Sequence, residues 1–233
     1  MINAKFTPIE MPVGSKYGND YFVVNSYKLG RVVKLYSKLE FKNWLTLELN
    51  PEVLTFCEQP FRAEMLINGK VKETVFDMWV SYKNGCEEFQ EVKYSDELTN
   101  PQNNSYTRCT EQIDFQRKWC KFNKMPYTVR NEDDIEHGRY HIENLKHISS
   151  CIKRYDHNYA KSYYERICIA LNQESITLEN LYYNMAHQLY FNEFLSVISF
   201  AYYDGLISLE LINNPLGMNT EVKQFGKQAM QFS

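Results

Sequence analysis

Three acidic residues and a lysine in the first half of the chain have the types and the order that phosphodiester hydrolysis requires. Glu40 opens a helical pattern, Asp77 falls in a strand-like run, and Glu91 and Lys93 share the next strand-like run. Carboxylate oxygens are ligands of Mg²⁺, and a lysine beside them can stabilise the charge that grows on an attacked phosphate. The four side chains therefore predict a metal-dependent phosphodiesterase site.

The Glu91-Val92-Lys93 triplet carries little weight by composition alone. With 29 acidic residues and 18 lysines in the chain, about two triplets of an acid, any residue and a lysine are expected by chance. Three occur, the others at 40–42 and 221–223. Glu91 and Lys93 differ because they lie in an apolar strand pattern, where residues two apart project to the same face. Their charged ends are therefore expected to converge.

The composition is that of a protein with a core of its own and no export or membrane signal. Its 233 residues, 44% of them hydrophobic, suffice for one large or two small domains. No run of about eighteen apolar residues occurs and the N-terminus lacks a hydrophobic signal region, so a soluble, cytoplasmic bacterial protein is expected. The six cysteines form no Cys-x-x-Cys pair, which favours reduced thiols over a zinc knuckle or a disulfide framework.

The formal net charge of −3 argues against a protein that simply coats DNA, but basic side chains are concentrated locally. The stretch 108–130 contains six basic residues and only two acids, Glu111 and Asp114. A solvated helix face would have the same composition, but beside a carboxylate site the stretch indicates contact with DNA. Gln112 and Gln116 are weaker candidates for lining the cleft. The predicted DNA-binding residues are Arg31, Lys34, Arg108, Arg117, Lys118 and Lys121.

The elements that must position these side chains are a helix, a run of strands, a second helix and a further strand in one block of about 135 residues, which implies an α/β layer. A helix is predicted at 37–49, with Ser37 as its N-cap. Asn68-Gly69 indicates a hairpin. A polar, mobile loop is expected at 95–105, followed by a helix at 107–123. The predicted strands are 21–27, 53–57, 62–67, 71–80, 87–94 and an edge strand at 126–129.

From about residue 142 the pattern becomes helical. The predicted helices are 142–154, 159–171, 176–186 and 193–203. Gly205 interrupts the pattern before a strand at 206–212, an order typical of a winged helix, with a plain helical bundle as the alternative. His137 and His141 are four residues apart but lack the other ligands of a metal motif. Beyond Pro215 the chain is polar and is expected to be flexible or ordered only by a partner.

An ordered set of short motifs resembles the TnsA endonuclease subunit of heteromeric bacterial cut-and-paste transposases. The resemblance covers about residues 28–135 well and the remainder in outline. The motifs are Arg31, Ser37-x-Leu39-Glu40, Leu47-Glu48-x-Asn50-Pro51-Glu52-Val53, Glu58-Gln59-Pro60, the Asp77 strand, Glu91-Val92-Lys93 and the basic helix that ends at Met125-Pro126-Tyr127. Phe76 departs from the pattern, because a proline often precedes the aspartate in this nuclease superfamily.

The resemblance implies a restriction-endonuclease-like mixed sheet flanked by helices, followed by a smaller, helical winged-helix-like domain. The expected domains are a catalytic domain at 1–138 and a winged-helix-like domain at 139–214, and the polar tail at 215–233 is expected to be flexible or to bind a partner. The family's catalytic residues map onto Glu40, Asp77 and Lys93.

Within that site, Asp77 is expected to be the central metal ligand. Glu91, at the position before the lysine that holds an acid or an amide, would be the second, with the Val92 carbonyl as a further donor. Glu40 would complete the site directly or through water, and Lys93 would face the scissile phosphate. Each assignment has a plainer alternative. Asp77 could be a turn acid and Glu91 a solvated strand acid. Glu40 could be a first-turn acid favoured by the helix dipole, and Lys93 a salt-bridge partner.

The resemblance further implies Mg²⁺ as the metal, with Mn²⁺ able to substitute, and double-stranded DNA at transposon ends as the substrate. The expected partners are a TnsB-type DDE transposase, which would cut and join the 3′ strands, and a TnsC-type AAA+ ATPase. The chain itself would cut the 5′ strands. A stand-alone restriction or repair nuclease, and a non-catalytic protein that binds DNA or the ATPase, are the alternatives.

Overall fold

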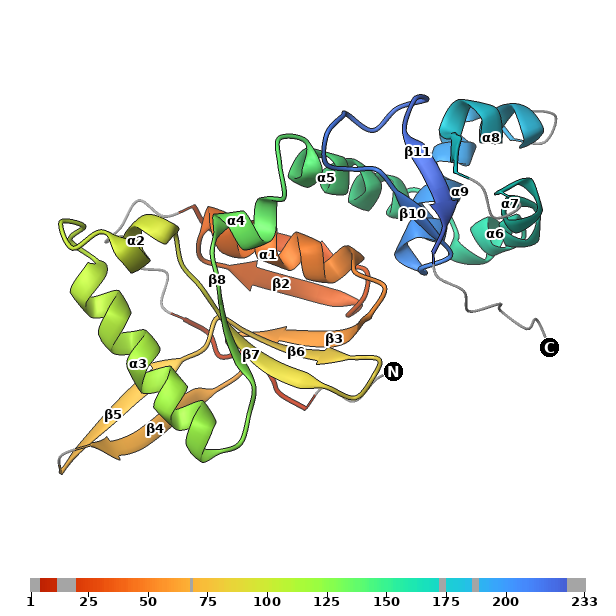
Figure 1. Ribbon diagram of the computed structural model, residues 1–233. Helices are drawn as coiled ribbons and strands as arrows, with labels where there is room; N and C mark the ends of the chain where they lie inside the picture. The colour runs from red at the N-terminus through yellow and green to blue at the C-terminus, as the bar shows by residue number, and fades with distance from the viewer. Residues whose placement is uncertain (1–4, 12–19, 68, 172–174, 186–188, 226–233) are drawn as a thin grey trace. The chain divides into compact units, whose positions relative to one another are not determined.

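A computed structural model describes residues 5–11, 20–67, 69–171, 175–185 and 189–225. The chain separates into two compact units (Figure 1), of which the first contains residues 1–48 and 52–136 and the second residues 49–51 and 137–233. No helix in the described part of the chain is long and apolar enough to cross a membrane.

A four-stranded mixed sheet is the centre of the first unit. Its strands follow the order β3 (Val53–Glu58), β6 (Met78–Tyr82), β7 (Glu87–Val92) and β8 (Tyr127–Arg130). The β3–β6 and β6–β7 pairs are antiparallel, whereas β7 and β8 are parallel. A parallel pair needs a long crossover connection, which here contains α2 (Ser95–Thr99) and α3 (Tyr106–Phe122).

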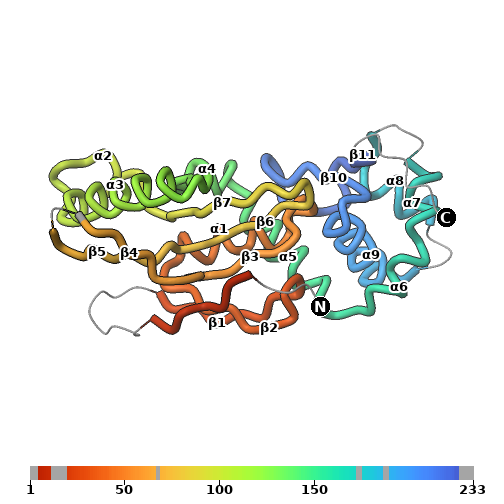
Figure 2. The backbone as a smooth tube through the Cα atoms, turned by 90° about the horizontal axis from the view of Figure 1, so that it is seen from below, coloured from red at the N-terminus to blue at the C-terminus, as the bar shows by residue number. Residues whose placement is uncertain are grey.

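Two antiparallel ribbons accompany this sheet. The first pairs β1 (Phe22–Ser26) with β2 (Arg31–Leu35), and the second pairs β4 (Arg62–Ile67) with β5 (Lys70–Val75). The β4–β5 pair lies beside α3 in both views of the backbone (Figures 1 and 2). The predicted hairpin is therefore confirmed in its pairing, although Asn68 of its turn lies outside the described residues.

Helices cover the two faces of the mixed sheet (Figure 1). α1 (Lys38–Leu49) contacts one face, where Asn43 Nδ2 donates to Gln90 Oε1 at 3.0 Å. α3 contacts the other, where Gln116 Nε2 donates to Glu91 Oε2 at 2.7 Å. Gln90 and Glu91 are consecutive in β7, so their side chains point to opposite faces of the sheet. The short helix α4 (Glu132–Glu136) follows β8.

An aromatic core fills the space between the sheet and α3. Phe76 and Phe89 stack with their ring centroids 4.5 Å apart, and Trp119 of α3 lies 5.9 Å from Phe89. Trp79 and Cys120 are buried in the same cluster. Close packing of this kind resists displacement of its members, so the core gives a rigid base to the strand ends beside it.

The sequence analysis predicted most elements of this unit, and three details were wrong. The expected strand 71–80 breaks, since β5 ends at Val75 and β6 begins at Met78, and Asp77 therefore lies between two strands. The strand expected to reach residue 94 ends at Val92. The segment 95–105 contains the helix α2. The first two differences lie at the ends of strands, and both concern the acidic cluster.

The second unit packs short helices around α9 (Phe191–Tyr203) and adds a small sheet. α9 is almost entirely apolar and buried from Phe194 onward. The other helices are α5 (His141–Ile152), α6 (His157–Lys161), α7 (Tyr164–Leu171) and α8 (Leu178–Met185). The sheet has the order β10 (Ile207–Leu209), β11 (Glu221–Gln224) and β9 (Ile176–Thr177), and both pairs are antiparallel.

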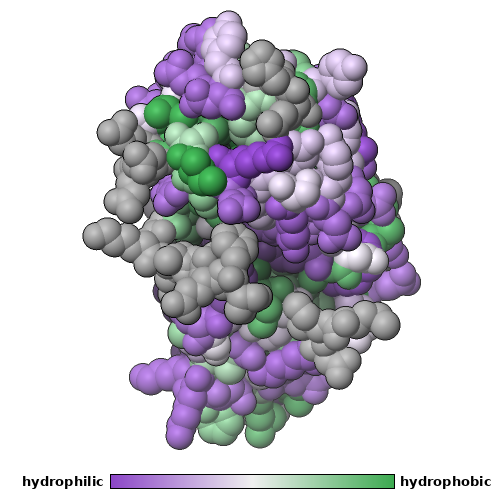
Figure 3. Space-filling model, turned by 90° about the vertical axis from the view of Figure 1, so that its right-hand side faces the viewer, coloured by the Kyte–Doolittle hydropathy of each residue, from purple (hydrophilic) through white to green (hydrophobic). Residues whose placement is uncertain are grey.

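Two expectations for this unit were wrong. The helix predicted at 159–171 is divided between α6 and α7. The flexible tail predicted from residue 215 contains β11, the central strand of the sheet, while residues 226–233 lie outside the described residues. The molecular face in Figure 3 is mostly hydrophilic with scattered hydrophobic side chains, consistent with apolar side chains being directed into the cores.

Candidate active site

Asp77 lies in the break between β5 and β6, where backbone and side chain are both held. Its carbonyl oxygen accepts a hydrogen bond from the Gln59 amide at 3.1 Å, and its Oδ2 accepts one from the Val92 amide at 2.7 Å. The neighbouring Phe76 is fully buried. The carboxylate is thereby fixed at the end of β7, close to the residues that follow it.

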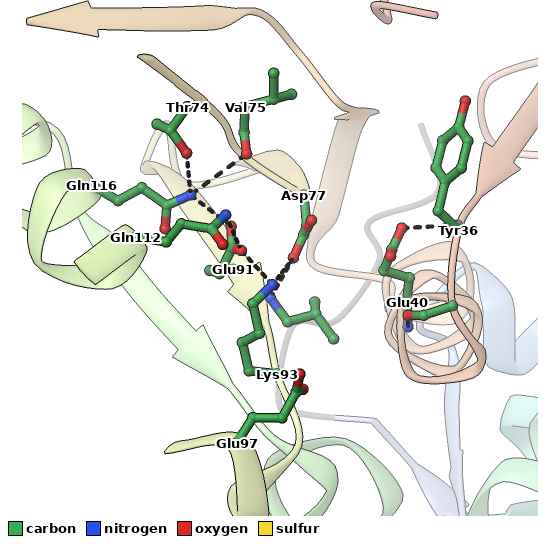
Figure 4. A network of polar contacts seen from close by, with 12 residues as sticks. Tyr36, Glu40, Thr74, Val75, Asp77, Glu91, Lys93, Glu97, Gln112 and Gln116 are labelled. Atoms are coloured by element: carbon green, nitrogen blue, oxygen red, sulfur yellow. Dashed lines mark hydrogen bonds and ion pairs between the residues drawn. The ribbon is translucent and has the colours of Figure 1, made fainter. Parts of the chain in front are cut away.

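The Lys93 ammonium lies close to two of the predicted acids, Glu91 and Asp77. Its Nζ lies 2.6 Å from Glu91 Oε1 and 3.8 Å from Asp77 Oδ2 (Figure 4). Although β7 ends at Val92, the Lys93 amide donates to the Arg130 carbonyl and continues the pairing with β8. The expected convergence of Glu91 and Lys93 is confirmed, and its cause is the two-residue period of an extended chain.

Glu91 is fully buried and is held by two amides from α3. Gln112 Nε2 donates to its Oε1 at 2.7 Å, and Gln116 Nε2 donates to its Oε2, also at 2.7 Å. Sequence reasoning ranked both glutamines below the charged residues. Their four-residue spacing, which places both side chains on one helix face, was the signal that could have ranked them higher.

Glu40 lies apart from this group, on the first turn of α1 (Figure 4). The helix begins after Ser37, whose Oγ accepts from the Glu40 amide at 3.1 Å, so the predicted N-cap is confirmed. Glu40 Oε2 accepts from the Tyr36 amide at 3.1 Å and from Gln59 Nε2 at 3.3 Å. Gln59 therefore contacts both Glu40 and the Asp77 backbone, a role that the sequence did not reveal.

Burial and mutual repulsion dominate the electrostatics of the acids. Burial raises the pKa of Glu40 to about 8, and the negative charge of Asp77 contributes to the rise. Burial likewise raises the pKa of Glu91 to about 7, with Asp77 adding to the effect and Lys93 and Gln116 opposing it. Burial by itself would lower the pKa of Lys93, but Asp77 and Glu91 raise it above its ordinary value. Lys93 is therefore protonated at neutral pH.

The candidate metal ligands are all oxygen atoms, which suit a hard divalent cation. Carboxylate and carbonyl oxygens are the ligands that Mg²⁺ prefers, and two acids here, the buried Glu91 and the half-buried Asp77, face a single ammonium group. In the described part of the chain, no three His, Cys, Asp or Glu side chains are already gathered closely enough to hold a metal ion. Asp77 and Glu91 meet at Lys93, whereas Glu40 is the outlying member of the set.

The predicted DNA-binding residues divide into two groups. Arg31 forms a two-pronged ion pair with Glu58, at 2.6 and 2.7 Å, and Glu58 is only 2% exposed, so the Arg31 guanidinium neutralises a buried charge. Lys34 pairs with the exposed Glu10 at 2.7 Å. The other four are exposed residues of α3: Arg108, Arg117, Lys118 and Lys121.

Part of the first unit matches a known protein family. Residues 50–132 match the family described as TnsA-like endonuclease N terminal. The matched segment contains Asp77, Glu91 and Lys93 together with both glutamines of α3, while Glu40 precedes it. No curated protein matches the chain.

Proposed function

We propose that this chain, whose residues 50–132 match the TnsA-like endonuclease N-terminal family, is the metal-dependent DNA endonuclease subunit of a Tn7-like transposase. The observation that carries the proposal is the Lys93 ammonium, 2.6 Å from the buried Glu91 and 3.8 Å from Asp77. A mixed sheet that presents two acids and a lysine at the end of one strand is what a restriction-endonuclease-like nuclease needs.

Asp77 and Glu91 would hold Mg²⁺ or Mn²⁺, with the Val92 carbonyl nearby and Glu40 completing the site. Such an ion, when bound, supplies a Lewis acid and lowers the pKa of bound water. The chain's own contribution is to hold the acids in place and to exclude bulk water from Glu91, which is fully buried. Lys93, kept protonated by its two acidic neighbours, would donate to the phosphate oxygen on which charge develops.

The four basic residues of α3 support DNA as the substrate, because they are exposed on the same helix whose Gln112 contacts Glu91. With a net charge of −3, the chain has little general affinity for DNA, since such affinity rests on neutralising phosphates. A TnsB-type transposase and a TnsC-type ATPase would therefore bring the subunit to the transposon ends, where it would cut the 5′ strands.

The topology of the second unit supports a winged-helix-like domain. α7, β9, α8, α9, β10 and β11 follow one another, and the antiparallel sheet has the order β10-β11-β9. α9 is apolar and buried over most of its length, so it does not offer the polar face with which helices read DNA bases. We therefore assign DNA contact to α3 of the first unit.

A strand-specific cleavage assay tests the proposal. Transposon-end DNA, labelled separately on each strand, is incubated with the chain, the partner transposase and ATPase, ATP and Mg²⁺. Asp77→Ala and Lys93→Ala are expected to abolish 5′ cutting while 3′ cutting and joining persist. Wild-type 5′ cutting by either variant would overturn the assignment. Efficient cleavage of naked DNA without partners would instead favour a stand-alone nuclease.

Calorimetry addresses the metal directly. Wild-type protein is expected to bind Mn²⁺, and Asp77→Ala is expected to lose that binding. A wild-type chain that binds neither Mg²⁺ nor Mn²⁺ would favour a non-catalytic role on the same fold.

A further inference from the structure

We propose that Gln112 and Gln116 are positioning residues that hold the Glu91 carboxylate in its metal-binding orientation, and that Tyr127 fixes the orientation of Gln116. The inference rests on the proposed function. Each of the three side chains contacts Glu91 or a residue that does, and the contacts come from α3 and β8, outside the strands that carry the acids.

Gln116 is the junction of the network. It is fully buried, and its Nε2 donates to Glu91 Oε2 at 2.7 Å. The same nitrogen lies 3.2 Å from Thr74 Oγ1 and 3.5 Å from the Val75 carbonyl, at the end of β5 just before Asp77. One amide thus contacts both segments that present the candidate ligands, and a buried polar group with so many partners resists reorientation.

Tyr127 determines which end of the Gln116 amide faces Glu91. Its hydroxyl donates to Gln116 Oε1 at 2.6 Å. An ionised carboxylate only accepts hydrogen bonds, so the amide nitrogen must point to Glu91 and its oxygen must be satisfied elsewhere. The phenol meets that requirement from β8, the strand parallel to β7.

Glu91 Oε1 accepts two hydrogen bonds, one from Gln112 Nε2 at 2.7 Å and one from Lys93 Nζ at 2.6 Å. If Lys93 turns toward a phosphate, Gln112 and Gln116 still leave Glu91 with one hydrogen bond on each oxygen. The amides would thus keep the acid in place during a step in which its ammonium partner is engaged elsewhere. Partners of this kind around metal ligands typically change metal affinity by about 10- to 100-fold when removed.

Mn²⁺ titration calorimetry of the full chain tests this inference. Gln116→Met and Gln112→Met keep the side-chain length and remove the donor. We expect Gln116→Met to weaken Mn²⁺ binding at least about tenfold, Gln112→Met to weaken it less, and Tyr127→Phe to weaken it severalfold. Gln102→Leu, at an exposed position ahead of α3, is the matched control and should bind as wild type does. Melting curves establish that each variant is folded.

The inference would be overturned if the Gln116→Met and Tyr127→Phe variants both bound Mn²⁺ with an affinity within twofold of wild type. That result would leave the proposed nuclease function intact. Should Gln116→Met fail to fold, Tyr127→Phe decides alone, since it removes a single hydroxyl from a half-buried side chain. A wild-type chain without Mn²⁺ binding would refute the metal site itself, and this inference with it.

Discussion

The two buried glutamates of the site are held very differently. Glu91 is surrounded by an ammonium and two amide donors, all within 2.7 Å. Glu40 has a backbone amide at 3.1 Å and a longer contact from Gln59 at 3.3 Å. Accordingly, burial raises the pKa of Glu40 to about 8 but that of Glu91 only to about 7. The α3 side of the site is therefore preorganised, and the α1 side is the adjustable one.

Lys93 should show the largest effect, because it belongs to the preorganised side. Lys93→Met is expected to reduce 5′-strand cleavage by about 100- to 1,000-fold, the usual effect of losing one donor to a developing anion. The measurement is single-turnover cleavage of labelled transposon ends with both partners present. Lys42→Met is the matched control, since Lys42 is also the third residue of an acid-x-lysine triplet but pairs with Glu136. Equal losses in both variants would contradict the assignment.

Glu40→Gln probes the adjustable side through stability. The pKa of Glu40 in the folded protein, about 8, lies above its value of 4.5 in the unfolded chain. The folded state therefore binds the extra proton between these values, and the free energy of unfolding falls as pH rises from about 4.5 to 8. Without metal, Glu40→Gln should unfold with a free energy higher by roughly 2–4 kcal/mol at pH 8.5, and the gain should vanish below about pH 4.5.

Urea unfolding of metal-free protein at several pH values measures this difference. Glu111→Gln, on the exposed face of α3, serves as the control and should change stability little at any pH. A Glu40→Gln variant no more stable than wild type at pH 8.5 would show that the Glu40 side is as well satisfied as the Glu91 side.

The Arg117→Ala variant tests whether the exposed side of α3, which carries Arg117, acts separately from the buried side, which carries Gln116. Arg117 is exposed, whereas the preceding Gln116 is buried. Arg117→Ala should weaken DNA binding about fivefold and reduce the salt dependence by about one phosphate contact. Its Mn²⁺ affinity should equal that of wild type. A change in metal affinity would show that the two faces are coupled.

Gln59 should show the smallest effect on metal binding. Its contact with Glu40 is 3.3 Å long, against 2.7 Å for Gln116 and Glu91. Calorimetry of Gln59→Met should give an Mn²⁺ affinity about two- to threefold weaker than wild type, compared with at least about tenfold for Gln116→Met. Equal losses at both positions would remove the distinction between a preorganised and an adjustable side.

Local patterns in the sequence were sufficient for part of this site. Ser37 before an acidic first turn predicted the start of α1, and the two-residue period predicted that Glu91 and Lys93 would meet. Asp77 was placed inside a strand because Phe76, Trp79 and Val80 are apolar. Aspartate is depleted in strands, and the break at Asp77 follows that preference.

The partners of the acids could not be predicted, because they come from elements distant in sequence. Gln116 reaches Glu91 across 25 residues, and Gln59 reaches Glu40 across 19. β11 was missed for a related reason. Its Glu221-Val222-Lys223 pattern alternates polar and apolar residues, but its pairing with β9 lies more than forty residues away. Only the packed fold brings such segments together.

The central position of β11 also constrains when the second unit can fold. β10 and β9 each pair with β11 and with no other described strand. During synthesis, therefore, both strands present unpaired backbone edges until residues 221–224 emerge from the ribosome, and exposed edges of this kind invite pairing with other chains. The nascent second unit thus depends on its last described strand to close its sheet, and a chain interrupted near residue 215 would leave two open edges where the intact protein has a paired strand.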